Sequence, residues 1–303
     1  MQQLGCTGMT VSRIALGCMR MADLTRQEAS KVVSTSLHQG MNFFDHADIY
    51  GGGESEIRFA QAMTDLGIKR EDIFLQSKCG IRKGYFDFSK EYIFKSVDGI
   101  LKRLNTDYLD VLALHRPDVL MDAEEVAEAF YTLQKDGKVL HFGVSNQNIY
   151  QMELLQSYLH QPLVVNQLQL SPAHTPLIDA GLHVNMKDSA AIMRDGGVID
   201  YCQLKKITIQ AWSPFLIDLQ KGVFVNHPDY AVLNAVLQDV AQRYQVSYEA
   251  IVVAWLLRHP SAIQVVVGSM NTDRLMNITQ ATDVNLSREE WYEIYRSAGN
   301  YLP

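Results

Sequence analysis

The sequence predicts an α/β fold, a (β/α)8 barrel of the TIM type, and two observations favour it. Short apolar runs that suit buried parallel strands alternate with segments of helical period along the 303 residues. No Gly-rich turn follows the first apolar run, where an open doubly wound sheet would bind a dinucleotide. We therefore expect eight strands that close into a barrel, at residues 13–16, 42–45, 73–77, 110–114, 141–144, 163–167, 207–211 and 264–267.

The segments between and before these strands complete the predicted fold. Residues 2–12 contain the turn formers Gly5 and Gly8 and are expected to form a small hairpin across the floor of the barrel. Residues 175–204 are long for a connection, so we expect an extra helix and a loop over the active face after the sixth strand. Residues 1–303 are expected to form one domain. Helical patterns occupy residues 27–37, 90–104, 123–135, 150–158 and 233–244.

Composition narrows the class of protein and its partners. Apolar residues make up 47% and charged residues 20%, as in an ordinary globular chain with a sizeable core. The net charge is −7 and no run of Lys and Arg occurs, which argues against nucleic acid and membrane surfaces as partners. No apolar stretch is as long as a membrane span and the first residues do not resemble a signal peptide, so we expect a cytoplasmic protein, with a monomer as the default.

Cysteine and histidine spacing gives no metal or disulfide pattern. The nine histidines include no HExxH arrangement, and we expect no metal site. Four cysteines without a CxxC pair are too few and too scattered for a disulfide framework in a chain of this length. We interpret them as free thiols, namely Cys6, Cys18, Cys79 and Cys202.

Polar residues gather at the predicted carboxyl ends of the strands, which share one mouth in a barrel. Asp45 ends one predicted strand and Lys78 directly follows the next, and we expect them to neutralise each other because isolated buried charges are costly. Tyr50 follows Asp45 closely, and Gly51 to Gly53 are expected to permit a sharp loop rather than to cradle a pyrophosphate. A Lys⁺ beside a Tyr lowers the phenol pKa and makes it a usable general acid. His115, at another strand end, is placed to orient a carbonyl.

These residues lie in segments that resemble the aldo-keto reductase superfamily over nearly the whole chain, and within it the bacterial branch often called YdhF-like. Each segment alone is weak, but together and in order they are specific. They are GMNFFDHADIYGGGESE at 40–56, LQSKCGI around Lys78, LALHRPD around His115, FGVSN ending at Asn146, VVNQLQLSP around Gln167, AWSP starting at Trp212, and VVVGSMNTDRL ending at Leu275.

The resemblance implies an NADPH-dependent reduction of aldehydes or ketones to alcohols, with NADH possible as cofactor. It places the family's catalytic tetrad on Asp45, Tyr50, Lys78 and His115, with Tyr50 as proton donor. It also implies that Trp212 stacks on the nicotinamide. The implied cofactor-binding positions are Gly17, Cys18, Met19, Asp45, Ser145, Asn146, Gln167, Trp212, Ser213, Pro214, Gly268, Ser269, Arg274 and Asn277.

Two residues depart from the family pattern, and alternative roles and functions remain open. His46 stands where many family members have Thr, and Gly268 stands where better-known members have a Lys that can meet a 2′-phosphate. Ser145 and Asn146 also suit the N-cap of the next helix. A nucleotide-bound regulatory subunit is one alternative function, and a Schiff-base lyase using Lys78 is another, although Asp45 would keep that lysine protonated. The resemblance does not imply a particular substrate. We expect the segments that follow Gln167 and His115 to determine substrate specificity, and we expect the site to be open.

Overall fold

The computed structural model describes residues 1–192, 196–218 and 220–302, and eight of its strands close into a barrel. All pairings within the barrel are parallel, and the last strand closes against the first. The predicted (β/α)8 barrel is confirmed. Its strands are β3 (Ile14–Gly17), β4 (Phe43–Asp45), β5 (Phe74–Cys79), β8 (Leu109–Leu114), β9 (Val139–Ser145), β10 (Leu163–Gln169), β11 (Thr208–Trp212) and β14 (Gln264–Val267).

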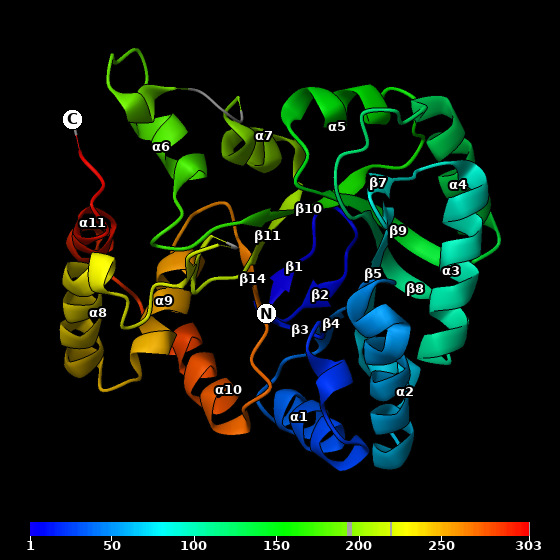
Figure 1. Ribbon diagram of the computed structural model, residues 1–303, viewed down its shortest axis with the longest axis horizontal. Coiled ribbons are helices and arrows are strands. Elements are labelled where there is room, and N and C mark those ends of the chain that lie inside the picture. Colours follow the sequence, from blue (N-terminus) through cyan, green and yellow to red (C-terminus); the bar gives the residue numbers. More distant parts are fainter. Residues whose placement is uncertain (193–195, 219, 303) are drawn as a thin grey trace.

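Helices surround the barrel (Figure 1), and several begin at a polar side chain that caps them. The side chain of Thr25 caps the first helix and that of Ser287 the last, each in a reciprocal pair with a Glu three residues later. The helices are α1 (Arg26–His38), α2 (Glu54–Leu66), α3 (Lys90–Leu104), α4 (Ala123–Lys135), α5 (Ile149–Gln156), α6 (Pro176–Leu182), α7 (Val198–Lys205), α8 (Ala231–Tyr244), α9 (Tyr248–Leu257), α10 (Thr272–Thr279) and α11 (Arg288–Ser297).

The N-terminal hairpin covers the floor of the barrel, as predicted. Strands β1 (Gln2–Gln3) and β2 (Thr10–Val11) pair antiparallel and lie across the barrel centre in Figure 1. Leu4 and Val11 are fully buried against barrel residues such as Phe43. The Gly5 amide donates to the Thr208 hydroxyl at 2.7 Å. The hairpin therefore closes this end to ligands and leaves the opposite end as the site.

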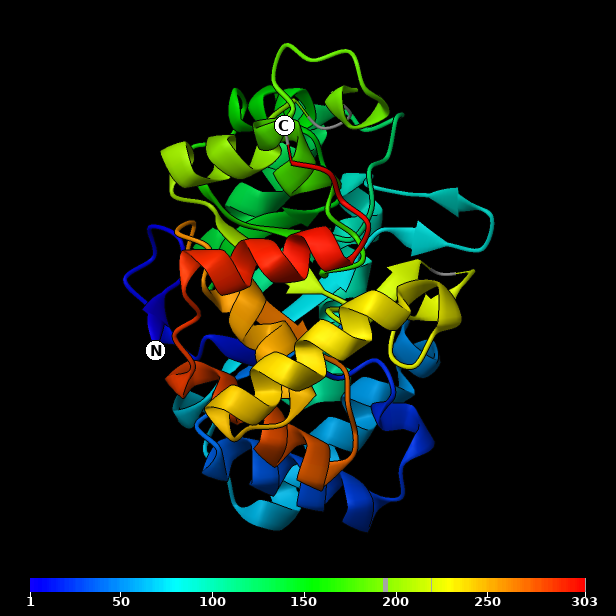
Figure 2. The ribbon, with the colours of Figure 1, turned by 90° about the vertical axis from the view of Figure 1, so that its left-hand side faces the viewer.

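Two small hairpins that the sequence did not predict line the other end. Strands β6 (Ile81–Arg82) and β7 (Tyr85–Phe86) form one, which projects at the end opposite the β1–β2 hairpin (Figure 2). Strands β12 (Leu216–Asp218) and β13 (Gly222–Val223) form the other. The predicted extra helix after the sixth strand is α6, and α7 then leads back to β11. No helix of the described residues is long and apolar enough to cross a membrane.

Candidate active site

A tight loop after β4 brings Tyr50 over the barrel mouth. The 3-10 turn Tyr50–Gly53 holds Gly51 at φ 58° and Gly53 at φ 96°, backbone conformations that disfavour other residues. A Cβ on Gly51 would lie 2.4 Å from the Ala22 Cβ. The three glycines are absent from the residues around the cavity described below, so the predicted sharp loop accounts for them.

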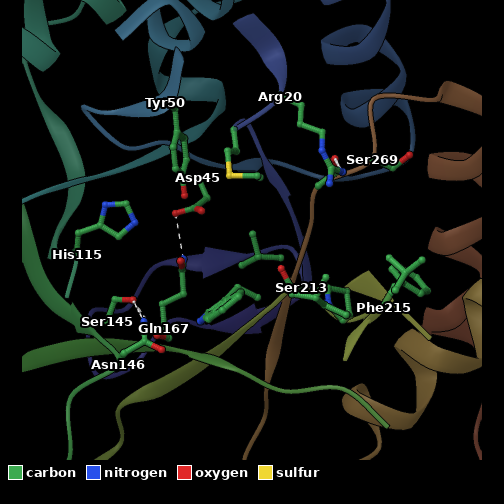
Figure 3. A pocket seen from close by; sticks show the side chains of 18 of the residues that line it. Arg20, Asp45, Tyr50, His115, Ser145, Asn146, Gln167, Ser213, Phe215 and Ser269 are labelled. Atoms are coloured by element: carbon green, nitrogen blue, oxygen red, sulfur yellow. Dashed lines mark hydrogen bonds between the residues drawn. The ribbon is translucent and has the colours of Figure 1, made fainter. Parts of the chain in front are cut away.

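Tyr50, Lys78, Asp45 and His115 converge at this mouth, three of which are labelled in Figure 3. The Lys78 Nζ donates to Asp45 Oδ1 at 2.6 Å and to the His46 carbonyl at 2.7 Å. The same Nζ lies 5.2 Å from the centre of the Tyr50 ring. The Tyr50 and His115 rings meet edge to face, with centres 5.9 Å apart. The expected neutralisation of Lys78 by Asp45 is therefore present.

Burial changes the pKa values that the sequence suggested. Burial raises the pKa of Tyr50, and the charge of Lys78 offsets this only in part, so the net direction is upward. The expectation of a lowered phenol pKa is thus wrong for the protein without ligands, because desolvation of the phenolate outweighs one cation. Burial lowers the pKa of Lys78, but Asp45 and Tyr50 outweigh it and the net pKa is raised. Lys78 therefore stays protonated.

Two buried histidines beside this group are held neutral. Burial, with the nearby Lys78 charge, lowers the pKa of His115 to about 2 and that of His46 to about 3. The His115 Nδ1 and both ring nitrogens of His46 have no hydrogen-bond partner among the described residues. His46 packs edge to face on Phe59 at 4.7 Å, which supports a packing role for this departure from the family.

A buried layer of amide side chains, which the sequence analysis missed, holds Asp45 from inside the barrel. Its Oδ1 accepts from Gln76 Nε2 at 2.7 Å and from Gln167 Nε2 at 3.1 Å, besides Lys78. Gln210 accepts from both Gln76 and Gln167 and donates to Gln264 at 2.9 Å. Three hydrogen bonds to one oxygen fix the direction of the Asp45 carboxylate.

A cavity of about 490 Å³ runs from this group toward the start of α10. All predicted cofactor positions line it except Cys18 and Asn277. Cys18 is fully buried, and Asn277 is exposed on α10. The remaining lining residues are Arg20, Ile49, Tyr50, Ile81, His115, Arg116, Phe215, Leu216, Val223, Val225, Tyr248, Glu249 and Val266.

The walls of this cavity differ from those that the sequence predicted. Apolar residues after β11, such as Phe215 and Val225, together with Ile81 of the β6–β7 hairpin, line it. The connection after Gln167 instead lines a second, neighbouring cavity, to which Gln169 and Leu177 contribute. The reason is that residues 213–218 and 220–225 lie over the mouth, with β12 and β13 paired as a hairpin that could not be seen in so short a pattern.

Ser145 and Asn146 face the cavity rather than cap a helix. The Ser145 hydroxyl donates to the Gln167 carbonyl at 3.0 Å, and the Asn146 amide donates to Ser145 Oγ at 2.7 Å. Asn148 caps α5, together with Gln151, so the predicted capping role of Ser145 or Asn146 is wrong. Asn146 takes φ 56°, a left-handed conformation that Asn tolerates better than most residues.

At the far end of the cavity, two arginine side chains lie near the N-terminus of helix α10. Asn271 caps α10 by accepting from the Arg274 amide at 2.9 Å, and Arg274 Nε lies 3.7 Å from Glu249 Oε1. Arg20, which the sequence analysis missed, donates to the Gly268 carbonyl at 3.3 Å. Figure 3 shows Arg20 beside Ser269, on the side of the cavity away from His115. A guanidinium therefore stands next to the position where better-known reductases have Lys.

Comparison with known proteins agrees with this geometry. The model of the Aldo/keto reductase family matches residues 13–298. The chain belongs to the aldo/keto reductase family. It is 35% identical to the uncharacterized oxidoreductase YcsN of Bacillus subtilis, covering 96% of this chain and 95% of that one. It is 34% identical to the oxidoreductase YdhF of Escherichia coli, covering 97% and 96%.

Other relatives extend the comparison. A 6-dehydroglucose reductase of Agrobacterium fabrum is 32% identical and covers 95% of this chain and 94% of its own. The crystal structure of a thermostable aldo-keto reductase, Tm1743, superposes with a TM-score of 0.78 at 24% identity, covering 98% of both chains. The resemblance to the YdhF-like branch is confirmed, and the protein is an NAD(P)H-dependent oxidoreductase that reduces carbonyl groups.

Among the described residues, no group of three or more His, Cys, Asp or Glu side chains is arranged to hold a metal.

Proposed function

We propose that the protein reduces aldehydes or ketones to alcohols with NADPH, using Tyr50 as general acid. The observation that carries this is the buried ion pair of Lys78 and Asp45, whose Nζ and Oδ1 atoms are 2.6 Å apart. The pair lies beneath Tyr50, and Tyr50 and His115 both line the cavity. Tyr50 gives its proton to the substrate oxygen as negative charge develops there. Lys78, kept charged by Asp45, stabilises the tyrosinate that this leaves. His115 stays neutral and orients the carbonyl.

The cavity residues fit a nicotinamide dinucleotide. Polar side chains of Ser145, Asn146 and Gln167 suit the carboxamide, and the Trp212 indole suits the ring. One face of that indole is covered by the Arg116 guanidinium at 5.5 Å, which leaves the other for stacking. Gly17 also lines this cavity, and a Cβ there would lie 3.0 Å from the Val266 side chain, so a larger residue would crowd the barrel. When bound, the nicotinamide supplies the hydride that reduces the carbonyl carbon.

Preference for NADPH would come from the far end. Arg274 in the first turn of α10, the amides of that turn and the Ser269 hydroxyl can converge on a 2′-phosphate, for which a guanidinium has the right donors. The Glu249 carboxylate near Arg274 opposes this, because it repels a phosphate and would accept from the ribose hydroxyls of NADH. Two or three charge-assisted contacts outweigh one carboxylate, so we expect NADPH to bind roughly tenfold to a hundredfold more tightly.

The alternatives have less support. A Schiff-base lyase needs a neutral lysine, but the pKa of Lys78 is raised by Asp45 and Tyr50. A purely regulatory role would need no proton donor, whereas the tetrad is complete here. Borohydride trapping with a carbonyl compound is expected to leave Lys78 unmodified, and a trapped adduct would favour the lyase.

Fluorescence titration with NADPH and NADH, followed by a carbonyl panel, tests the function. Binding is expected to quench Trp212, and Trp212→Ala should abolish most of the quenching. The other tryptophans, Trp255 and Trp291, stack on each other at 4.8 Å and do not line the cavity, so Trp291→Phe is the control. The panel includes 6-dehydroglucose because of the named relative. Cofactor binding without oxidation of NADPH or NADH by any member would contradict the proposed reduction.

A further inference from the structure

A second cavity of about 460 Å³ adjoins the first and shares Arg116, Asn146 and Trp212 with it. Its lining is mostly polar, and within the described part of the chain it contains no carboxylate. The other lining residues are Pro117, Gln147, Asn148, Gln151, Leu168, Gln169, His174, Pro176, Leu177 and Val198. Tyr50 and His115 line the first cavity only, so the three shared residues are the link between the proton donor and the second cavity.

Arg116 is a half-buried cation with no anionic partner in the described chain. Two other part-buried arginines are ion-paired, Arg70 with Asp110 and Arg103 with Glu56, each at 2.6 Å, while Arg13 and Arg258 donate to backbone carbonyls. Arg116 has neither an ion pair nor a hydrogen-bond acceptor among the described residues, only the face of Trp212. The carboxylate nearest in sequence, Asp118, accepts from the Phe88 and Leu120 amides instead. A partly desolvated guanidinium without an acceptor is costly unless a ligand supplies one.

A second donor lacks an acceptor at the same place. The Trp212 Nε1 is buried and has no hydrogen-bond partner among the described residues. An indole N–H can only donate, so it also needs an oxygen from a ligand or water. The amide oxygen of Gln147, likewise buried and unpartnered, suits a hydroxyl on the same ligand.

The place of Arg116 links that ligand to the proton donor. His115 and Arg116 are consecutive residues that directly follow β8, with Cα atoms about 3.8 Å apart as in any trans peptide. Both line the cavity that Tyr50 also lines, so a compound whose carbonyl is held by His115 and Tyr50 lies within reach of the Arg116 side chain. On the basis of the proposed function, we propose that the natural substrate is a short aldehyde or ketone that carries an oxyanion, which Arg116 and the Trp212 N–H bind in the second cavity.

Matched substrate pairs test this assignment. The ratio kcat/KM is measured with NADPH for succinic semialdehyde against butanal, 4-carboxybenzaldehyde against benzaldehyde, and glyceraldehyde 3-phosphate against glyceraldehyde. In at least one pair, kcat/KM for the acidic substrate should exceed kcat/KM for the neutral one by tenfold or more, chiefly through a lower KM. The pair with the larger ratio shows whether the oxyanion is a carboxylate or a phosphate.

Variants then locate the effect. Arg116→Met should lower the ratio of kcat/KM for the acid to kcat/KM for its neutral partner to about one, whatever it does to both through Trp212, and Arg116→Lys should restore part of that ratio. The control is Arg82→Met, because Arg82 also lies over an aromatic ring, Tyr92, but lines neither cavity. Neutral aldehydes that are reduced as well as acids, or equal losses for both in Arg116→Met, would overturn the assignment while carbonyl reduction stands. Absence of turnover with every aldehyde would overturn the proposed function and the assignment with it.

Discussion

The two ends of the main cavity are built in different ways. At the Tyr50 end, the Lys78 side chain is completely buried and Asp45 accepts three hydrogen bonds on one oxygen. At the α10 end, the Arg274 side chain is 56% exposed and its ion-pair partner is Glu249 at 3.7 Å. Buried pairs resist rearrangement, whereas exposed pairs are worth little and are screened by salt. The fold therefore fixes the geometry around the proposed proton donor, whereas the contacts that we propose to select the cofactor are adjustable.

Removal of the Lys78 charge should give the largest effect. Lys78→Met leaves Asp45 without its cation, so we expect kcat to fall by roughly 10²- to 10⁴-fold and stability to fall by about 3 to 5 kcal/mol. Because Lys78 opposes the rise in the pKa of Tyr50, its loss should raise that pKa further. Reduction needs the protonated phenol, so the basic limb of the pH profile should move upward.

Steady-state pH profiles and urea unfolding provide the measurements for this variant. The control is Lys138→Met, which breaks an ion pair with Asp98 at 2.7 Å between side chains that are 39% and 59% exposed. That change should cost under about 1 kcal/mol and leave kcat intact. Similar effects of the two substitutions would contradict the claim that a buried ion pair matters more than an exposed one.

Arg274→Ala probes the exposed end. The affinity for NADPH should fall by roughly tenfold to a hundredfold, while NADH affinity hardly changes, because the lost contacts are to the 2′-phosphate alone. Dissociation constants from fluorescence titration measure both. Glu249→Gln is the matched variant and should strengthen NADPH binding. Equal losses for the two cofactors would assign Arg274 to the shared adenosine or to holding α10.

The sequence located most of this site because the strand ends carry it. All eight strands were placed, but the third was predicted to end at Ser77, whereas β5 continues through Lys78 to Cys79. The pairing of Lys78 with Asp45 was predicted, but a lysine inside a barrel strand was not, and it is accommodated there because β4 and β5 pair and bring Asp45 beside it. The sequence also could not give the direction in which the pKa of Tyr50 shifts, because that direction depends on how deeply the phenol is buried.

Other residues of the site were missed for different reasons. Arg116 directly follows His115, and a charged residue at a strand end was a usable indication. Arg20 had no such indication: it meets Gly268, almost the whole chain away in sequence, only because β3 pairs with β14 as the barrel closes. Contacts made by closure cannot be predicted from local pattern.

His46 offers a smaller test of the buried end, through acid stability. Its pKa is lowered to about 3 by burial, so between about pH 6.5 and 3 the unfolded chain binds a proton that the folded one does not. Stability from this residue is therefore lost as pH falls. In His46→Leu, the loss of unfolding free energy between pH 7 and pH 5 should be smaller by about 2 kcal/mol. The control is His38→Gln, at an exposed position on α1, and identical pH dependence in all three proteins would contradict the prediction.

The most direct test of a preformed proton donor is Tyr50→Phe, with kcat and the NADPH dissociation constant measured on the same preparation. The substitution removes only the phenolic hydroxyl. We predict that kcat falls by at least about 10²-fold, while the dissociation constant stays within about twofold of the wild type. Unchanged turnover, or a loss of NADPH affinity as large as the loss of kcat, would contradict the assignment of Tyr50 as the general acid.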